Sequence, residues 1–213
     1  KKADVGVAMG ITGTDVAKEV ADMVVTDDNF VSIVHAIREG RIIFNNIVKS
    51  ITYLISCNLG EVIAIFVAIA LGLPAPLLPV QILWVNLVTD GLPALSLAFD
   101  DGHEGIMQRH PSDHKSLLTK KSLSFIIPMG VLIGLLTILS FVVTYTMVGE
   151  DSARTIAFTT LVGLQMAMVF VVRNGQHPFS NKFLLISVAI SLILHIIIIS
   201  VPPFSLIFNP GFP

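Results

Sequence analysis

Long runs of apolar residues dominate the chain after residue 46. Each run is long enough, or nearly so, to cross the hydrocarbon core of a bilayer, which takes about 20 residues of α-helix. The fourth run is the shortest, and Arg173 could snorkel from its end to the membrane surface. The pattern predicts a mainly α-helical, polytopic transmembrane bundle. Its five spans are expected at Ile47–Leu71, Pro79–Phe99, Leu123–Val148, Ile156–Val172 and Phe183–Val201.

The first 46 residues follow a different pattern. Two short apolar runs, Ala3–Met9 and Met23–Thr26, predict strands, and the segments Asp15–Ala21 and Phe30–Glu39 predict helices. The order strand, helix, strand, helix is typical of the edge of an α/β domain with a parallel sheet. About 40 residues cannot bury a core alone, so we expect this segment to be part of a larger domain or to pack on something outside the chain. A single helix over residues 41–71 would be roughly 45 Å long and would form a stalk that enters the membrane.

Composition and charge support a membrane protein and set its orientation. Hydrophobic residues make up 54% of the chain and charged residues only 13%, with a mean hydropathy of +0.83, whereas soluble chains are about one quarter charged. Every Lys and Arg except Arg154 lies on the side of the N-terminal segment, so the positive-inside rule predicts a cytoplasmic N-terminal segment. A net charge of −2 gives no reason to expect a nucleic-acid partner, and the single Cys excludes a disulfide framework within the chain.

Two carboxylates lie inside the predicted spans, and ionisable groups there indicate function by default. Glu61 is three residues after Asn58, which places both on one side of a helix. In the second span Asn86, Thr89 and Asp90 occupy positions i, i+3 and i+4. The first and the second span therefore each present a cluster of oxygen-bearing side chains.

A helix distortion is expected beside the second cluster. Gly91 and Pro93 follow Asp90 directly, and Pro93 has no N–H to offer the carbonyl of Thr89. Transporters use such distorted helices to build ion sites at mid-membrane. Carboxylate, amide, hydroxyl and carbonyl oxygens are hard ligands that suit Ca²⁺. The alternative is that these polar residues only hydrogen-bond neighbouring helices together.

The sequences NLGEV and PVQILWVNLVTDGLPA resemble the core of the calcium-pump branch of P-type ATPases, as in the sarco/endoplasmic reticulum pump and its bacterial relatives. The first 46 residues look like the end of that family's haloacid-dehalogenase-like phosphorylation domain and the stalk helix leaving it. FSNKFLLISVAISL, with VPPF, is similar to the penultimate span of the bacterial members. The resemblance implies that residues 1–40 end the cytoplasmic phosphorylation domain. It also implies that residues 41–213 form the stalk and spans five to nine of ten.

The resemblance implies a set of ion ligands, residue by residue. It assigns Asn58, Glu61, Asn86, Thr89 and Asp90 to metal binding. Where two-calcium pumps have a Glu in the eighth span, this chain has Gln165, which favours one Ca²⁺ per cycle. A packing hydrogen bond is the other interpretation of Gln165. Within pumps, the wording of these motifs argues for Ca²⁺, with Mn²⁺ possible and Na⁺ or H⁺ as the next choices.

The motifs that are absent carry as much information. The chain has no DKTGT motif with the phosphorylated Asp, no TGDGVND motif and no PEGLP-type span. We therefore expect neither catalytic nor cofactor-binding residues here. The parent would be an ATP-driven pump exporting Ca²⁺ from the cytoplasm through an aspartyl-phosphate cycle, with Mg²⁺ and ATP bound outside this chain. Its partners would be the lipid bilayer and the N-terminal part of the same pump, and the expected location is a bacterial plasma membrane.

Other interpretations remain open at this point. A secondary cation transporter or channel module could also carry a pair of intramembrane carboxylates, although it would not need the α/β edge. A non-catalytic partial pump with a binding or regulatory role is a third possibility.

Several further residues carry weaker signals. GITGTD after the first strand is a poor match to phosphate-binding loops and favours a structural turn. Asp27 and Asp28 are expected to cap a helix, and His195 to be a packed, neutral residue of the last span. The irregular spacing of His103, His110 and His114 gives only a weak case for a metal site.

Overall fold

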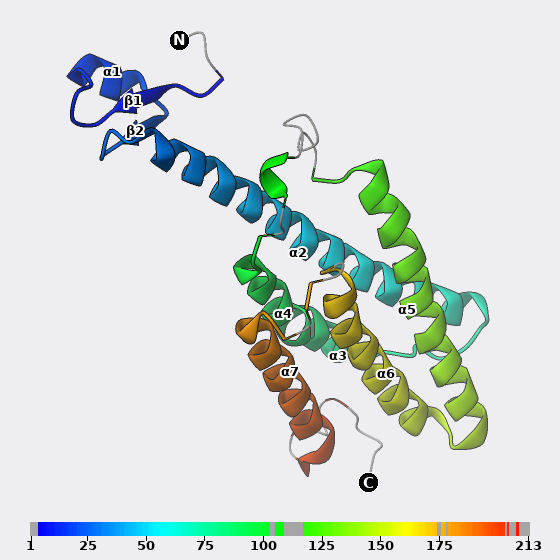
Figure 1. Cartoon of the computed structure of the whole chain (residues 1–213). Helices are drawn as coiled ribbons and strands as arrows, with labels where there is room; N and C mark the ends of the chain where they lie inside the picture. The colour runs from blue at the N-terminus through cyan, green and yellow to red at the C-terminus, as the bar shows by residue number, and fades with distance from the viewer. Residues whose placement is uncertain are drawn as a thin grey trace. The chain divides into compact units, whose positions relative to one another are not determined.

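The computed structural model describes residues 4–102, 105–108, 117–173, 176–177, 179–202, 204 and 208. The chain divides into two compact units: Lys1–Phe44 with Gly102–His110, and Asn45–Asp101 with Pro111–Pro213. His103, His110 and His114 lie outside the described residues, so their role stays a prediction. The elements of both units are shown along the chain in Figure 1.

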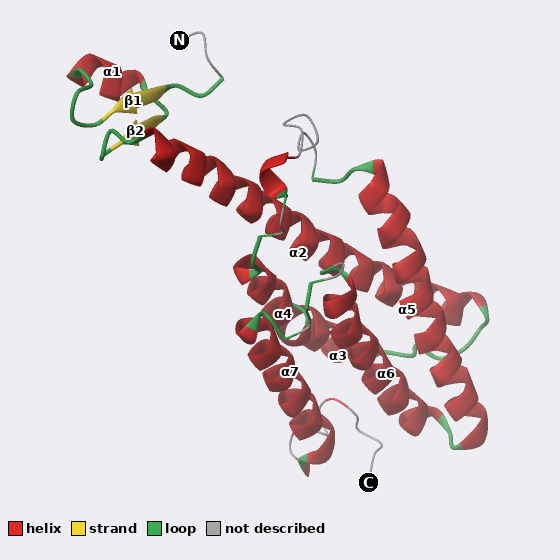
Figure 2. Ribbon diagram, in the orientation of Figure 1, coloured by secondary structure: helices red, strands yellow, loops and turns green. Residues whose placement is uncertain are grey.

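The first unit contains a small parallel sheet. Strands β1 (Val7–Met9) and β2 (Met23–Val25) pair in parallel, with Val7 opposite Met23, and α1 (Asp15–Val20) connects them (Figure 2). Thr14 caps α1 by accepting a hydrogen bond from the amide of Ala17. The predicted order of strand and helix is confirmed, although the strands are shorter than the apolar runs. No residue of α1 is buried.

The GITGTD segment forms a turn whose amides are bound by a carboxylate of the chain itself. Asp28 accepts hydrogen bonds from the backbone N–H of Ile11 (2.8 Å) and Thr12 (2.7 Å) and from the Thr12 hydroxyl (2.7 Å). These bonds, that of the Thr12 hydroxyl first, lower the pKa of Asp28. Asp27 accepts from the amide of Asn29 and from Ser32, as expected of a residue at the start of a helix. The turn is therefore structural here, because an internal anion occupies the position that a phosphate would need.

A single long helix replaces the two helices expected between residues 30 and 71. Helix α2 runs without interruption over Phe30–Ala70. Gly40, the only residue at the expected boundary that disfavours helix, is tolerated, and no Pro lies in this range. The helix begins in the first unit and continues into the second.

Five helical segments among the described residues are long and apolar enough to cross a membrane, which confirms the predicted bundle. The fourth begins six residues earlier than predicted, because its polar first turns are helical and Arg154 forms an i,i+4 ion pair with Glu150. The segments are α2, the second span Pro79–Phe99, α5 (Lys120–Met147), α6 (Glu150–Val171) and α7 (Lys182–Ser200).

Arg173 does not snorkel to the surface as its position suggested. Its residue is 1% exposed, and its guanidinium forms an ion pair with Asp100 at 3.0 Å. Because a buried charge is very unfavourable without a partner, this ion pair and the further hydrogen bonds of Arg173 are what allow its burial.

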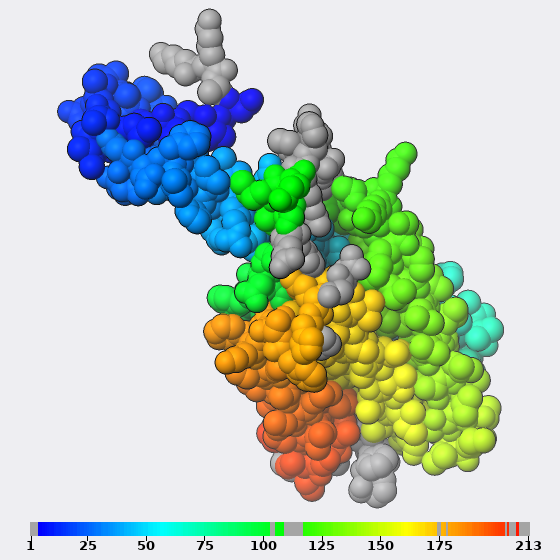
Figure 3. All heavy atoms as spheres, in the orientation of Figure 1, coloured from blue at the N-terminus to red at the C-terminus, as the bar shows by residue number. Residues whose placement is uncertain are grey.

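Helices α2 and α5 approach one another through glycines. A Cβ atom added to Gly130 would lie 2.7 Å from Leu59 Cδ2. One added to Gly134 would lie 2.7 Å from Ile63 Cβ and 2.8 Å from the backbone oxygen of Gly60. Small residues allow this close packing of membrane helices, where dispersion contacts replace the hydrophobic effect. In the space-filling view the side chains of α5, α6 and α7 close the spaces seen between the ribbons (Figure 3).

We expect Gly134→Ala to destabilise the bundle by about 1–3 kcal/mol, because the new methyl group meets a backbone oxygen that cannot move aside. Gly163→Ala is the matched control, since a Cβ there meets no atom within 4 Å. Thermal unfolding of both variants in detergent tests this. Equal melting temperatures for the two variants would show that the glycine contact is not needed.

Candidate functional site

The second span is an irregular helix, and its irregular part carries the polar residues. It consists of α3 (Pro79–Trp84), a π-helical turn (Val85–Thr89), α4 (Gly91–Ser96) and a 3₁₀ turn (Leu97–Phe99). The amide of Asp90 bonds to the carbonyl of Val85 at 2.8 Å, five residues back. The distortion expected from Gly91 and Pro93 is present, as a widened turn and not as an open break. Such π turns often occur at functional sites.

Gln165 on α6 joins the two intramembrane carboxylates. Its side-chain nitrogen donates to Glu61 Oε1 at 2.9 Å and to Asp90 Oδ2 at 3.3 Å. All three residues are buried, with Asp90 and Gln165 fully so. The cluster therefore combines residues from three spans that are far apart in the sequence.

The polar residues of the π turn complete this cluster from one side. Asn86 donates to Glu61 Oε2 at 2.9 Å and to the carbonyl of Ile82 at 3.0 Å. Thr89 is fully buried next to Asp90, and its hydroxyl donates to the carbonyl of Val85. Asn86 thus joins the carboxylates directly, whereas the Thr89 hydroxyl bonds to its own helix.

Asn58 is the predicted ligand that does not join the cluster. It lies on an exposed side of α2, while Glu61 one turn later is buried. Three residues correspond to 300° around a helix, so the two side chains leave the axis roughly 60° apart. The cluster formed by the described residues therefore includes Glu61, Asn86, Asp90 and Gln165, with Thr89 adjacent.

Tyr53 belongs to the cluster but was not predicted. Its hydroxyl donates to Asp90 Oδ1 at 2.9 Å, and its side chain is completely buried. Tyr53, Cys57 and Glu61 recur every four residues along one buried face of α2. That spacing was the signal available in the sequence.

The oxygens of the cluster suit a hard cation. Gln165 Oε1 is buried and has no hydrogen-bond partner among the described residues, which is costly unless another group binds it. Among the described residues, no three His, Cys, Asp or Glu side chains lie close enough to hold a metal by themselves. An ion held here would therefore need amide oxygens beside the two carboxylates. Asn86 and Gln165 now point N–H groups at those carboxylates, and their amides would have to turn to present oxygen.

The contacts of His195 are with residues outside this cluster. It is 3% exposed, its ring packs edge-on against Phe158 with centroids 4.7 Å apart, and its Nε2 lies 3.2 Å from the Thr159 hydroxyl. It is a packed residue between α6 and α7, as the sequence predicted.

Comparison with known proteins agrees with the membrane helices and identifies the family of the chain. Residues 74–211 match the family described as "Cation transporting ATPase, C-terminus". The Calcium-transporting ATPase 1 of Bacillus cereus is 47% identical over 98% of this chain and 26% of its own length. The Calcium-transporting ATPase of Bacillus subtilis is 46% identical, with 98% and 24% covered. An endoplasmic reticulum-type Calcium-transporting ATPase 3 of Arabidopsis thaliana is 39% identical, with 98% and 24% covered.

The chain spans about a quarter of the length of these relatives. The family match covers more than half of the chain and includes the second span with its π turn. The chain therefore belongs to the cation-transporting ATPase family, in the part that forms the C-terminus of these membrane proteins.

Proposed function

We propose that this chain is the ion-binding membrane part of an ATP-driven pump that exports Ca²⁺ from the cytoplasm. The observation that carries the proposal is the buried cluster in which Glu61, Asp90 and Gln165 meet from three spans. Two carboxylates with amide and hydroxyl oxygens provide the hard ligands that Ca²⁺ prefers. The relatives named calcium-transporting ATPases support this choice of ion.

The rest of the pump's machinery belongs outside this chain in this proposal. ATP would phosphorylate an Asp, with Mg²⁺ as cofactor, in domains outside this chain. The relative from Bacillus cereus is long enough to include such domains, since this chain covers 26% of it. Residues 1–40 would end the phosphorylation domain, and residues 41–213 would form the stalk and five spans. The exposed apolar side chains of α1, Val16 and Val20, support a covering partner for this small sheet.

The proposed orientation follows from charge. The N-terminal segment would be cytoplasmic, because the Lys and Arg residues gather on its side of the spans. The high identity to Bacillus proteins supports a bacterial plasma membrane as the location. A secondary transporter or channel module is not favoured, since the relatives are ATPases over nearly the whole chain.

The metal ligands in this proposal are Asn58, Glu61, Asn86, Thr89, Asp90 and Gln165. Asn58 is the least supported of them, because its side chain lies on an exposed face of α2. Gln165, which carries no charge, favours one Ca²⁺ per cycle. Manganese remains the alternative ion, since Mn²⁺ accepts the same oxygen ligands.

We expect Glu61→Gln and Asp90→Asn, made in the full-length protein, to weaken Ca²⁺-dependent phosphorylation from ATP. Each change removes a charge from the cation site but keeps the shape of the side chain. Loss of a ligand charge should raise the Ca²⁺ concentration for half-maximal phosphorylation at least about tenfold, the size of one 1.4 kcal/mol interaction.

Glu150→Gln is the control, because Glu150 is an exposed carboxylate at the other end of α6 that pairs only with its helical neighbour Arg154. It should behave as the unmodified protein. Unchanged calcium dependence in both site variants would exclude the cluster as the ion site.

Calcium activation of the unmodified pump should have a Hill coefficient of about one, because cooperativity needs more than one site. A Hill coefficient clearly above one would contradict the single-ion stoichiometry.

Gln165→Leu distinguishes the two roles of this residue. If Gln165 is a ligand, calcium affinity falls markedly in this variant. If the residue only packs, the melting temperature falls while calcium affinity stays unchanged.

A further inference from the structure

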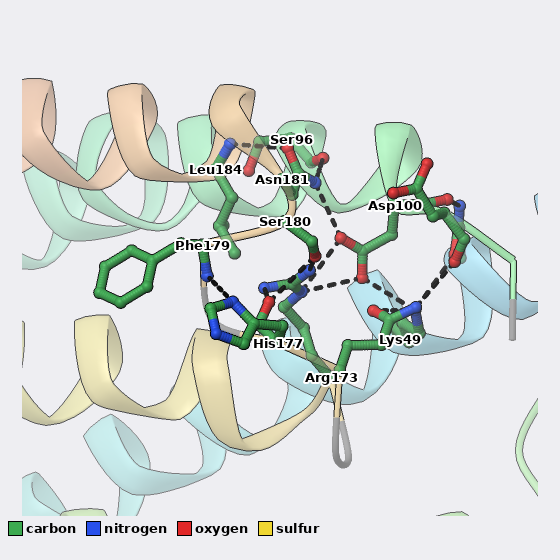
Figure 4. A network of polar contacts seen from close by, with 12 residues as sticks. Lys49, Ser96, Asp100, Arg173, His177, Phe179, Ser180, Asn181 and Leu184 are labelled. Atoms are coloured by element: carbon green, nitrogen blue, oxygen red, sulfur yellow. Dashed lines mark hydrogen bonds and ion pairs between the residues drawn. The ribbon is translucent and has the colours of Figure 1, made fainter.

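A second buried polar cluster surrounds Asp100, directly after the last residue of the second span. Lys49 Nζ donates to Asp100 Oδ2 at 2.8 Å, and Arg173 Nε donates to the two carboxylate oxygens at 3.0 and 3.1 Å. Asn181 Nδ2 donates to Asp100 Oδ1 at 2.8 Å. Figure 4 shows the carboxylate between the Lys49, Arg173 and Asn181 side chains. The Asp100 side chain has no exposed surface.

The donors around Asp100 are themselves held in place. Lys49 Nζ also donates to Asn46 Oδ1 and Gln176 Oε1, so its three N–H groups are all used. Arg173 donates further to the carbonyl of His177 and to the Ser180 hydroxyl. The cluster therefore has little freedom to rearrange around the carboxylate.

Backbone contacts fix the end of the second span in the same place. Asn46 donates to the carbonyls of Ala98 (3.2 Å) and Asp100 (2.8 Å). Asn181, which also caps α7, donates to the carbonyl of Ser96 at 2.9 Å. These contacts hold the chain around Asp100 as well as its side chain.

Charge makes the arrangement obligatory. Lys49, Arg173 and Asp100 are all buried, and a buried charge is very unfavourable without a partner. Burial raises the pKa of Asp100, but the hydrogen bonds from Lys49, Asn181 and Arg173 outweigh it and leave the pKa below its usual value. The group is therefore an ionised carboxylate at neutral pH, shared by two cations.

The segments that meet at Asp100 also carry Glu61, Asp90 and Gln165, the residues of the proposed ion site. Lys49 and Glu61 lie on α2, roughly 18 Å apart along the helix. Asp100 follows the span that contains Asp90, roughly 15 Å away by the same rise per residue. Arg173 follows α6, which carries Gln165 roughly 12 Å earlier. One carboxylate at the end of the second span thus binds the other two ligand-bearing segments, at a level different from that of the ion site.

We propose that Asp100 is a positioning residue for the ion site: by binding Lys49 and Arg173 it fixes the axial register of α2, the second span and α6, and so brings Glu61, Asp90 and Gln165 to one level. The inference rests on the proposed function, because it assigns a role relative to that site. A register error of one residue would shift a ligand by 1.5 Å along its helix, enough to spoil the geometry of a cation site. Asp100 acts through the helices and does not touch the ion.

The test uses Asp100→Asn in the full-length protein, with calcium activation of ATP hydrolysis as the readout. The Asn keeps the shape but cannot hold two cations. The half-maximal calcium concentration should rise about 10–100-fold, the usual effect of losing a residue that orients metal ligands, while the maximal rate at saturating calcium changes much less. Asp101→Asn is the matched control, because the neighbouring Asp101 is exposed and only its backbone carbonyl takes part, by accepting from Gln176.

The double variant Lys49→Met with Asp100→Asn separates positioning from folding. It removes one cation together with the carboxylate, which restores the net charge of the three buried groups without restoring the tie between the helices. We expect its melting temperature to recover relative to Asp100→Asn, while the half-maximal calcium concentration stays raised. Recovery of calcium affinity together with stability would show that the cluster only balances charge, and would overturn the proposal.

Glu61→Gln in the same preparations distinguishes the possible failures. If Glu61→Gln weakens calcium activation but Asp100→Asn does not, the positioning role is wrong and the proposed function stands. If neither variant changes calcium activation, the cluster is not the ion site and both proposals fall.

Discussion

The need to pair every buried charge determines how this bundle is put together. In an apolar environment an isolated ionised side chain is far less stable than in water, so it must find partners within the protein. Glu61 and Asp90 have amide and hydroxyl donors, and Asp100 has a lysine, an arginine and an asparagine. Each carboxylate takes its donors from spans other than its own. Polar contacts therefore help to specify that α2, the second span, α6 and α7 are neighbours, whereas α5 packs on α2 through glycines.

The two carboxylate clusters differ in a way that suits different roles. Around Asp100 two cations face one carboxylate, so its negative charge is already balanced and a further cation would be repelled. Around Glu61 and Asp90 the described residues supply the two carboxylates with neutral donors and no cation. Neutral donors stabilise a carboxylate less than a cation does. In the proposed ion site a cation would therefore displace the neutral donors around Glu61 and Asp90, whereas it would not displace the charged groups around Asp100.

The apolar pattern predicted the five spans, because each is a long run with few charged interruptions. It also identified Glu61 and Asp90, since carboxylates are conspicuous in such runs. Helix α2 was predicted only as two separate helices, Phe30–Glu39 and residues 41–71, yet it continues without a break through Gly40 between them. The early start of α6 was not predicted, because its first turns are polar and continue no apolar run. An i,i+4 ion pair between Arg154 and Glu150 links residues of these turns.

The parts that the sequence could not predict depend on distant partners. Arg173 was expected at the membrane surface because its partner Asp100 is 73 residues away in the chain. Asn58 was grouped with Glu61 by spacing and by the family resemblance, but the buried face of α2 follows the series Tyr53, Cys57 and Glu61. Tyr53 was overlooked because a tyrosine within an apolar run resembles an ordinary packing residue. Spacing along one helix indicates a face, but only the neighbouring helices decide which side of that face is buried.

Gln165 shows how an uncharged residue can stabilise two carboxylates that lie close together. One amide nitrogen serves Glu61 and Asp90 at once, which separates two groups that would otherwise repel each other. A carboxylate in its place would add a third negative charge with no cation among the described contacts to balance it. The same amide carries a buried oxygen without a partner in the described part of the chain, so rotation of the side chain would present oxygen in place of the N–H donor. If the cluster is the ion site, Gln165 would stabilise it both without a cation and with one, and the free-energy difference between the two states would be smaller than with three carboxylates. A transport site must release its ion as well as bind it, and this smaller difference favours release.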